Sequence, residues 1–307
     1  MKIIHFKHHE IDKPAYDECI LKSLQGTVYA MSWYLDTVSP GWELLATEDY
    51  GIVMPIPVKK KSGLSYSIQP SFCQQLGIFS AIPVEEKIIT GFIEHISYFY
   101  YRLQLNSGNV FENQKARLQQ NYLLDMGQSY EQIRKKYKTN CQRNIRKSET
   151  GNLQVFHSTE PDTYVNVLIR NASERPVIKL LPLLKKIIES AGRNAKTEIW
   201  NVRNNSGDIL SCVFFLYWKN RVYYMVPVST PQGRKQQSMS FLIDRFIHHH
   251  ATSGLILDFE GSSIPNIARF YEGFGAFRED YPLVIKDNLL GKVIRCTLYV
   301  LRRAYAR

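Results

Sequence analysis

The chain has 307 residues, a length that suits two domains or one large one, and 44% of them are hydrophobic, enough for a sizeable core. The net charge of +11 favours an anionic partner such as nucleic acid, a membrane surface or a phosphate-rich cofactor. Five scattered cysteines argue against a disulfide framework and a structural zinc site. Without a signal peptide or a long apolar run, we expect a cytoplasmic protein.

The first part, to residue 127, has the mixed pattern of an α/β domain. Turn residues and apolar runs alternate, and one segment carries apolar residues at helical spacing. The pattern predicts a helix after Asp12-Lys13-Pro14, a strand at Gly51–Val58, a basic turn at 59–63, a strand at Ser65–Ile68 and a helix at 85–101.

A long basic helix is predicted over Ser129–Gly151. Ser129 and Gln132 stand at the spacing of a capping box, and Gly151 suits the position after a helix end. The cations of this segment far outnumber its acids, Glu131 and Glu149. Two interpretations stay open: a solvated helix face, or an electrostatic guide for a phosphate-bearing substrate.

The second half has a more specific order of elements. Strands separated by clear turns predict a three-stranded antiparallel meander, which a polar loop, an amphipathic helix, a short apolar strand and another helix follow. The short strand is expected to lie parallel to the third strand of the meander. The predicted ranges are strands 197–203, 209–218 and 221–228, loop 229–237, helix 239–250, strand 255–259, and a helix from Pro265 to Gly273 or Gly275.

Two features of this half indicate an anion site beside a cleft. The loop before the amphipathic helix carries Arg234 and Lys235, and a helix N-terminus holds anions through its free N–H groups and its dipole. Pro227 cannot donate to a strand ladder, so its strand and the strand at 255–259 could part there and open a narrow cleft. A basic surface loop and an edge-strand proline are the alternatives.

The segment Ala268-Arg269-Phe270-Tyr271-Glu272-Gly273-Phe274-Gly275-Ala276 resembles the late helix of GNAT-type acyltransferases. The run Asp258-Phe259-Glu260-Gly261-Ser262 and the basic segment 133–151 are similar to the Fem branch, which includes peptidoglycan-bridge aminoacyltransferases. The resemblance implies two GNAT-like domains of mixed, mostly antiparallel sheet flanked by helices. The expected division is a degenerate GNAT-like domain at 1–127, a linking helix at 128–151 and an acyltransferase domain at 152–307.

The resemblance also implies roles for individual residues. Tyr271 would be the general acid for a leaving thiolate, and Glu260 the base, directly or through water. Helix packing and a turn position are the respective alternatives. Gln74 and Gln75 are expected to line an acceptor pocket between the domains. The residues expected to bind acyl-CoA are Val226, Val228, Arg234, Lys235, Gln236, Gln237, Ser238 and Met239.

Three hypotheses of function follow. The first is an N-acyltransferase that uses acetyl-CoA or another acyl-CoA and a small-molecule amine. The family's two loop glycines are missing from Arg234–Met239. This departure motivates the second hypothesis, an aminoacyltransferase that uses aminoacyl-tRNA and a cell-wall precursor. The third is a non-catalytic GNAT-fold binding protein. We expect no DNA partner.

Two further segments have patterns that suggest a ligand or a surface. His248, His249 and His250 are consecutive, and consecutive helical side chains point about 100° apart, so we expect no metal site there. The segment Asp287–Arg307 has the pattern of an amphipathic helix, which either docks on its own domain or rests on an anionic membrane as a peripheral contact.

Overall fold

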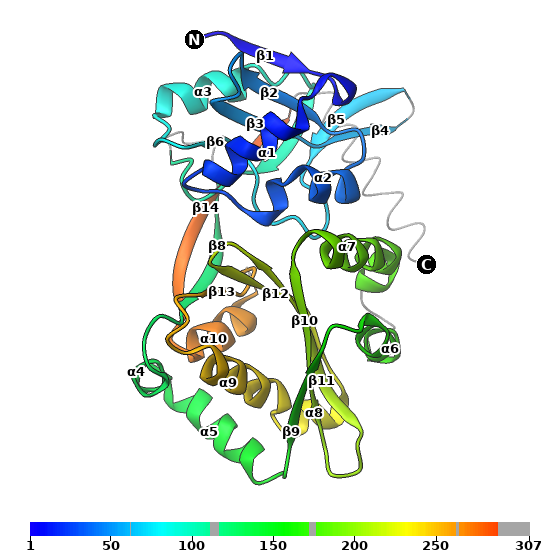
Figure 1. The fold of residues 1–307 in the computed structure, drawn as a ribbon, viewed down its shortest axis with the longest axis vertical. Helices are drawn as coiled ribbons and strands as arrows, with labels where there is room; N and C mark the ends of the chain where they lie inside the picture. Colours follow the sequence, from blue (N-terminus) through cyan, green and yellow to red (C-terminus); the bar gives the residue numbers. More distant parts are fainter. Residues whose placement is uncertain (62, 111–116, 172–175, 262–263, 288–307) are drawn as a thin grey trace. The chain divides into compact units, whose positions relative to one another are not determined.

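The computed structural model describes residues 1–307 except 62, 111–116, 172–175, 262–263 and 288–307 (Figure 1). The chain divides into two compact units, Met1–Gln119 with Asp280–Arg307, and Gln120–Glu279. Residues 120–151 group with the second unit, and Asp280–Asp287 group with the first. The expected domain boundaries at 127 and 151 remain a prediction. Among the described residues, no helix is long and apolar enough to cross a membrane.

A small sheet and three helices build much of the first unit. The strands β1 (Ile3–Phe6), β2 (Glu43–Thr47), β3 (Ile52–Ile56) and β6 (Phe79–Ser80) lie side by side in that order, and their pairs are antiparallel. The helices are α1 (Lys13–Lys22), α2 (Ser32–Val38) and α3 (Glu86–Glu94). The predicted N-terminal helix is therefore confirmed, and the Asp12 side chain caps it by accepting from the Ala15 N–H.

Three more strands belong to the first unit: β4 (Val58–Lys61), β5 (Leu64–Ile68) and β7 (Tyr100–Gln104). Strand β14 (Phe277–Asp287) belongs to this unit from Asp280 onward, and its residues 283–287 pair with β7. Two expectations were wrong here. The lysines at 59–61 belong to strand β4 rather than to a turn, because they pair with Leu64–Tyr66 of β5. The predicted helix at 85–101 ends at Glu94, and Tyr100 begins a strand that pairs with β5 and β14.

The second unit contains the predicted meander. The strand order is β8 (Arg117–Asp125), β13 (Ile256–Asp258), β12 (Arg221–Ser229), β11 (Ile209–Trp218), β10 (Lys196–Arg203) and β9 (Gln154–Ser158). Strands β10, β11 and β12 pair antiparallel, and β13 pairs parallel to β12, as expected. The mixed sheet of the predicted fold class is thus confirmed for this unit.

Helices cover both faces of this sheet (Figure 1). Helices α6 (Pro161–Asn171) and α7 (Leu181–Asn194) pack on β10–β12 from one side, and α9 (Ser238–His250) packs on β10 and β11 from the other. On the apolar face of α9, Leu242, Ile243, Phe246 and Ile247 are fully buried, as the spacing predicted, and Met239 is partly buried. Phe246 stacks on Phe215 with 3.9 Å between ring centroids. Helices α8 (Pro231–Lys235) and α10 (Pro265–Gly273) complete the part of this unit that positions the site.

The predicted basic helix is two helices. Helix α4 (Tyr130–Lys135) begins at the expected capping box, and α5 (Thr139–Glu149) follows after a break at Lys136–Lys138. The break has a physical cause: the Tyr137 side chain is 4% exposed in the core, and the Lys138 N–H donates to the Gly273 carbonyl of α10. A continuous helix could not make both contacts. The expected amphipathic helix at 287–307 begins on Asp287, the last residue of β14, and otherwise lies outside the described residues.

Candidate active site

A bulge interrupts strand β12 at Val226 and Pro227. Met225 pairs with Phe214 and Val228 with Cys212, so two residues of β12 lie opposite one residue of β11. Val226 has a φ of 42°, a left-handed value that a β-branched residue rarely adopts and that costs about 1–3 kcal/mol. Pro227 lacks an N–H, so a bulge is one of the few places in a sheet where it fits. Local strain of this kind clusters at ligand sites.

Strands β12 and β13 part just before this bulge. Their parallel pairing covers only Arg221 to Tyr223 on β12, whereas β12 continues to Ser229 beside β11. After Asp258, the segment that follows β13 stays paired with β8, because the Phe259 N–H donates to the Tyr122 carbonyl at 3.0 Å. The parting that Pro227 indicated is therefore present in the pairing of these two strands.

Tyr164 of α6 fixes the bulge from beneath. Its ring is fully buried, and its hydroxyl donates to the Val226 carbonyl at 2.7 Å. Val226 has no partner in the register of β11 and β12, and a carbonyl shielded from water without a partner would cost about 1–3 kcal/mol. Tyr164 thus stabilises a strained segment that the sequence marked only through Pro227.

Tyr271 of α10 packs next to the point where the two strands part. Its ring stacks on Phe259 at 4.6 Å and lies 6.1 Å from the Tyr224 ring of β12 and 6.1 Å from the Tyr122 ring. Burial raises the pKa of the Tyr271 phenol, and the nearby charges of Glu260 and Asp258 raise it further. The phenol is therefore protonated at neutral pH, the state that a general acid requires.

Glu260 follows β13 in a turn with left-handed backbone, φ 56°. Asp258 shapes this turn, because one carboxylate oxygen accepts the Glu260 N–H at 2.8 Å and the other pairs with Arg221 at 2.9 Å. Burial raises the pKa of Asp258, and the Arg221 charge opposes that shift. Burial raises the pKa of the Tyr164 and Tyr271 phenols, and the charge of Glu260 raises both further.

A groove of about 220 Å³ lies where β12 ends and α9 begins. Arg234 lines it from α8, and its guanidinium donates to the Ser229 carbonyl at 2.6 Å. Gln237 precedes α9 with a φ of 57°, which aims the first turn of that helix. The groove combines a cation with a helix start, a combination that suits a phosphate. The other lining residues are Ser229, Gly233, Met239, Ser240 and Phe270.

Sequence reasoning missed Gly233, which lines this groove. A Cβ there would lie 2.1 Å from the Leu210 carbonyl oxygen, so only glycine fits. The Gly233 N–H donates to the Thr230 hydroxyl, and this cap begins α8. The expected loop at 229–237 is therefore partly helical. Its importance could have been predicted from the sequence, because Gly233 is the one glycine between residues 229 and 237.

The structure brings only some of the predicted site residues to this groove. Arg234, Gln237 and Met239 line it, whereas Val228 and Ser238 are buried beside it. Lys235 is exposed and Gln236 half-buried, and neither lines the groove. Tyr271 faces the aromatic cluster, one position along α10 from the groove residue Phe270.

Gln74 and Gln75 lie in the first unit. Gln75 is 3% exposed, and its amide donates to the Gln74 side chain and accepts the Ser107 N–H. These bonds order a loop of that unit. The acceptor role remains a prediction.

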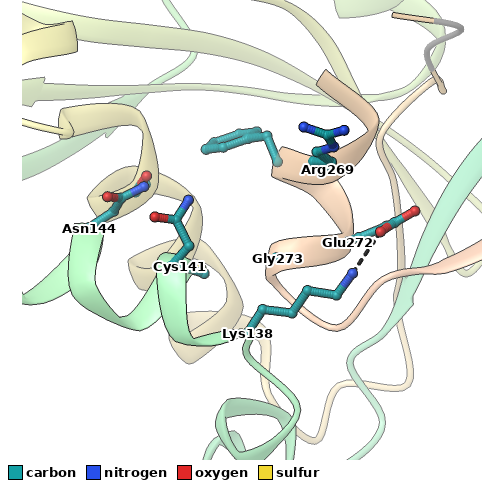
Figure 2. Close-up of a pocket in the computed structure, with 9 residues that line it drawn as sticks. Lys138, Cys141, Asn144, Arg269, Glu272 and Gly273 are labelled. Atoms are coloured by element: carbon teal, nitrogen blue, oxygen red, sulfur yellow. Dashed lines mark hydrogen bonds and ion pairs between the residues drawn. The ribbon is translucent and has the colours of Figure 1, made fainter. Parts of the chain in front are cut away.

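A second pocket, of about 420 Å³, adjoins the groove and shares Ser240 and Phe270 with it. Figure 2 shows Asn144 and Cys141 of α5 on one side and Arg269 and Glu272 of α10 on the other. The Lys138–Glu272 ion pair, at 2.6 Å, bridges the two helices. The remaining lining residues are Asn140 and Gly273.

Comparisons with known proteins identify the fold. No protein-family model matches the chain, and no curated protein matches it. The crystal structure of FemX is similar over 92% of this chain and 97% of its own, with a TM-score of 0.62 and 11% identity. A tandem GNAT protein from the clavulanic acid biosynthesis pathway is similar over 94% and 99%, with a TM-score of 0.55 and 9% identity.

A third similar structure is the C-terminal domain of a putative lysylphosphatidylglycerol synthetase from Agrobacterium fabrum, with 94% and 98% coverage, a TM-score of 0.55 and 9% identity. The chain therefore has the tandem GNAT-like fold of these proteins. The resemblance predicted from the Tyr271 segment is confirmed at the level of the fold. At sequence identities of 9–11%, these similarities show the fold but not the activity of the chain.

Proposed function

We propose that the chain is an N-acyltransferase that moves an acyl group, most simply acetyl, from acyl-CoA to an amine. The parting of β12 and β13 beyond Tyr223, together with the Arg234 groove at the end of β12, supports this proposal. A parted strand pair admits a narrow extended arm, and a cationic groove at a helix start suits the pyrophosphate to which such an arm is attached. The tandem GNAT fold agrees with this donor.

The proposed reaction forms a nitrogen–carbon bond and breaks the carbon–sulfur bond of the thioester. Glu260 accepts a proton from the amine, directly or through water, and Tyr271 donates one to the departing thiolate. One proton thus passes in net from amine to thiol. Main-chain groups on the side of β12 that β13 leaves open are suited to hold the oxygen of the tetrahedral intermediate.

A steady-state assay of thiol release from acyl-CoA, with a panel of amines, tests the proposal. Tyr271→Phe is expected to lower kcat at least about a hundredfold with the fold intact. Tyr122→Phe is the matched control, since Tyr122 belongs to the same aromatic cluster. Equal activity of the two variants would remove Tyr271 from the mechanism. If CoA does not bind at millimolar concentration, acyl-CoA is excluded as the acyl donor.

A second candidate donor, aminoacyl-tRNA with a cell-wall precursor as acceptor, is favoured by one surface. The side chains of Lys135, Lys136, Arg143, Arg146 and Lys147 are all exposed along α4 and α5. Such a row of cations suits an RNA backbone, and binding should weaken steeply as salt rises. A gel shift with tRNA that is absent even at low salt would exclude this donor. A structurally intact chain without turnover on either donor would favour a binding protein.

A further inference from the structure

The pocket between α5 and α10 is a formed cavity that the reaction above does not use. Its base is rigid, because a Cβ on Gly273 would lie only 3.3 Å from the Cβ of Cys141 and the Lys138 N–H binds the Gly273 carbonyl. The Lys138–Glu272 ion pair ties the two helices together beside it. A closely packed wall of this kind keeps the pocket in shape without a ligand.

Two asparagine amides line this pocket and can hydrogen-bond a ligand. The Asn140 amide oxygen accepts from Arg143, which leaves its amide N–H groups as donors. Within the described ranges, the Asn144 amide has no hydrogen-bond partner, and it is only partly exposed. Phe270 is half-buried and belongs to both cavities, so its ring forms a wall between them. Amides beside an aromatic ring suit a flat heterocycle.

The position of this pocket restricts the ligand further. The adjoining groove carries Arg234 at a helix start, which suits a phosphate, and the two cavities meet at Ser240 and Phe270. Arg269 is exposed on the rim, where its charge suits a second phosphate rather than a base edge. A ligand that fits both cavities has a phosphate at one end and a flat, hydrogen-bonding ring at the other, as a nucleotide does.

We propose that the Asn140–Asn144–Phe270 pocket binds the adenine of the donor's nucleotide, with its phosphate in the Arg234 groove. An asparagine amide pairs with the amino group and the adjacent ring nitrogen of adenine through two bonds. This inference rests on the proposed function, because it assigns the nucleotide end of the same donor. Adenosine occurs both in CoA and at the 3′ end of tRNA, so the pocket serves either candidate donor.

Calorimetry on the full chain tests the assignment with CoA, adenosine 3′,5′-bisphosphate, its guanosine counterpart, pantetheine and a tRNA. Asn144→Ala and Phe270→Ala are each expected to weaken CoA and the adenosine bisphosphate about tenfold and to leave pantetheine unchanged. The matched control is Asn205→Ala, an exposed amide in the turn between β10 and β11. Circular dichroism confirms that each variant is folded.

The outcomes separate this inference from the proposed function. CoA binding that is equal in wild type, Asn144→Ala and Phe270→Ala overturns the adenine pocket and leaves the acyltransferase proposal standing. Tighter binding of the guanosine bisphosphate also overturns it. Absence of binding by every adenosine ligand overturns both. If tRNA alone binds, and Asn144→Ala weakens it while Asn205→Ala does not, the pocket is supported and the donor is tRNA.

Discussion

The Tyr164 hydroxyl donates to the main-chain oxygen of Val226 at 2.7 Å, directly below the bulge of β12. Tyr164 belongs to α6, so a helix on one face of the sheet fixes the strained residue next to the parting of β12 and β13. The bond couples the packing of α6 to the shape of the proposed donor site.

The first prediction removes this bond. Tyr164→Phe keeps the ring but leaves the Val226 carbonyl unpaired, and the free energy of unfolding should fall by about 1–2 kcal/mol. Because the bulge loses its support, the affinity for acyl-CoA should fall as well. Urea unfolding and calorimetry measure the two effects. Tyr66→Phe, at a half-buried tyrosine of β5 in the other unit, is the control and should change neither.

A second prediction concerns the glycine that sequence reasoning missed. Gly233→Ala would place a Cβ 2.1 Å from the Leu210 oxygen, and the forced shift should destabilise the fold by about 1–3 kcal/mol. Gly192→Ala is the opposite case. A Cβ on Gly192 meets nothing within 4 Å, and alanine is the better helix former by about 0.5–1 kcal/mol. Thermal unfolding of both variants compares them; equal destabilisation would contradict the close approach at Gly233.

Arg234 provides the third prediction. Arg234→Ala should raise the Kd for CoA about fivefold to tenfold, because one charge-assisted bond to a phosphate is lost. The loss should shrink as salt rises, since an exposed cation is screened. Arg193→Ala removes an exposed cation of α7 that pairs with Glu189 outside the groove, and should leave the Kd unchanged. If wild type and Arg234→Ala have the same Kd for CoA at low salt, the phosphate of CoA does not bind at Arg234.

Much of the second unit could be predicted from local pattern. The meander, the amphipathic helix and the parallel strand all have short-range signals, and Pro227 marked the parting because a missing N–H has the same effect in any sheet. The resemblance in the Tyr271 segment gave the fold. These features depend on neighbours in the sequence.

The pocket between α5 and α10 could not be predicted in this way. Asn140 and Asn144 stand among cations on a segment that reads as one basic helix, and nothing local says that α10 packs against them. The break after α4 likewise depends on the core position of Tyr137 and on a bond to Gly273. Contacts between distant segments decide both features, and composition does not encode them.

Stability in acid gives the fourth prediction. Burial alone would raise the pKa of Glu198, but hydrogen bonds from Lys196, Trp200 and Tyr217 outweigh it and lower the pKa from 4.5 to about 2. A depressed carboxyl pKa stabilises the fold above its unfolded value, and this stability is lost as the pH falls from about 4.5 to 2. Glu198→Gln should lower the free energy of unfolding by up to about 3 kcal/mol at pH 6. In this variant the free energy of unfolding should change little between pH 4.5 and 2. Urea unfolding at several pH values measures it.

His250 should produce a separate loss of stability at higher pH. Burial first, and then the neighbouring His249, lower its pKa from 6.5 to about 4. The neutral ring contacts the Tyr217 hydroxyl at 3.0 Å, and since that hydroxyl donates to Glu198, its oxygen accepts from the ring Nε2–H. The unfolded chain takes up the proton first, so the free energy of unfolding should fall as the pH drops from about 6.5 to 4. His250→Gln keeps a donor for Tyr217 but has no titrating ring. In this variant the free energy of unfolding should no longer fall between pH 6.5 and 4, whereas the fall due to Glu198 below pH 4.5 should remain. A slope unchanged in His250→Gln would assign that window to another group.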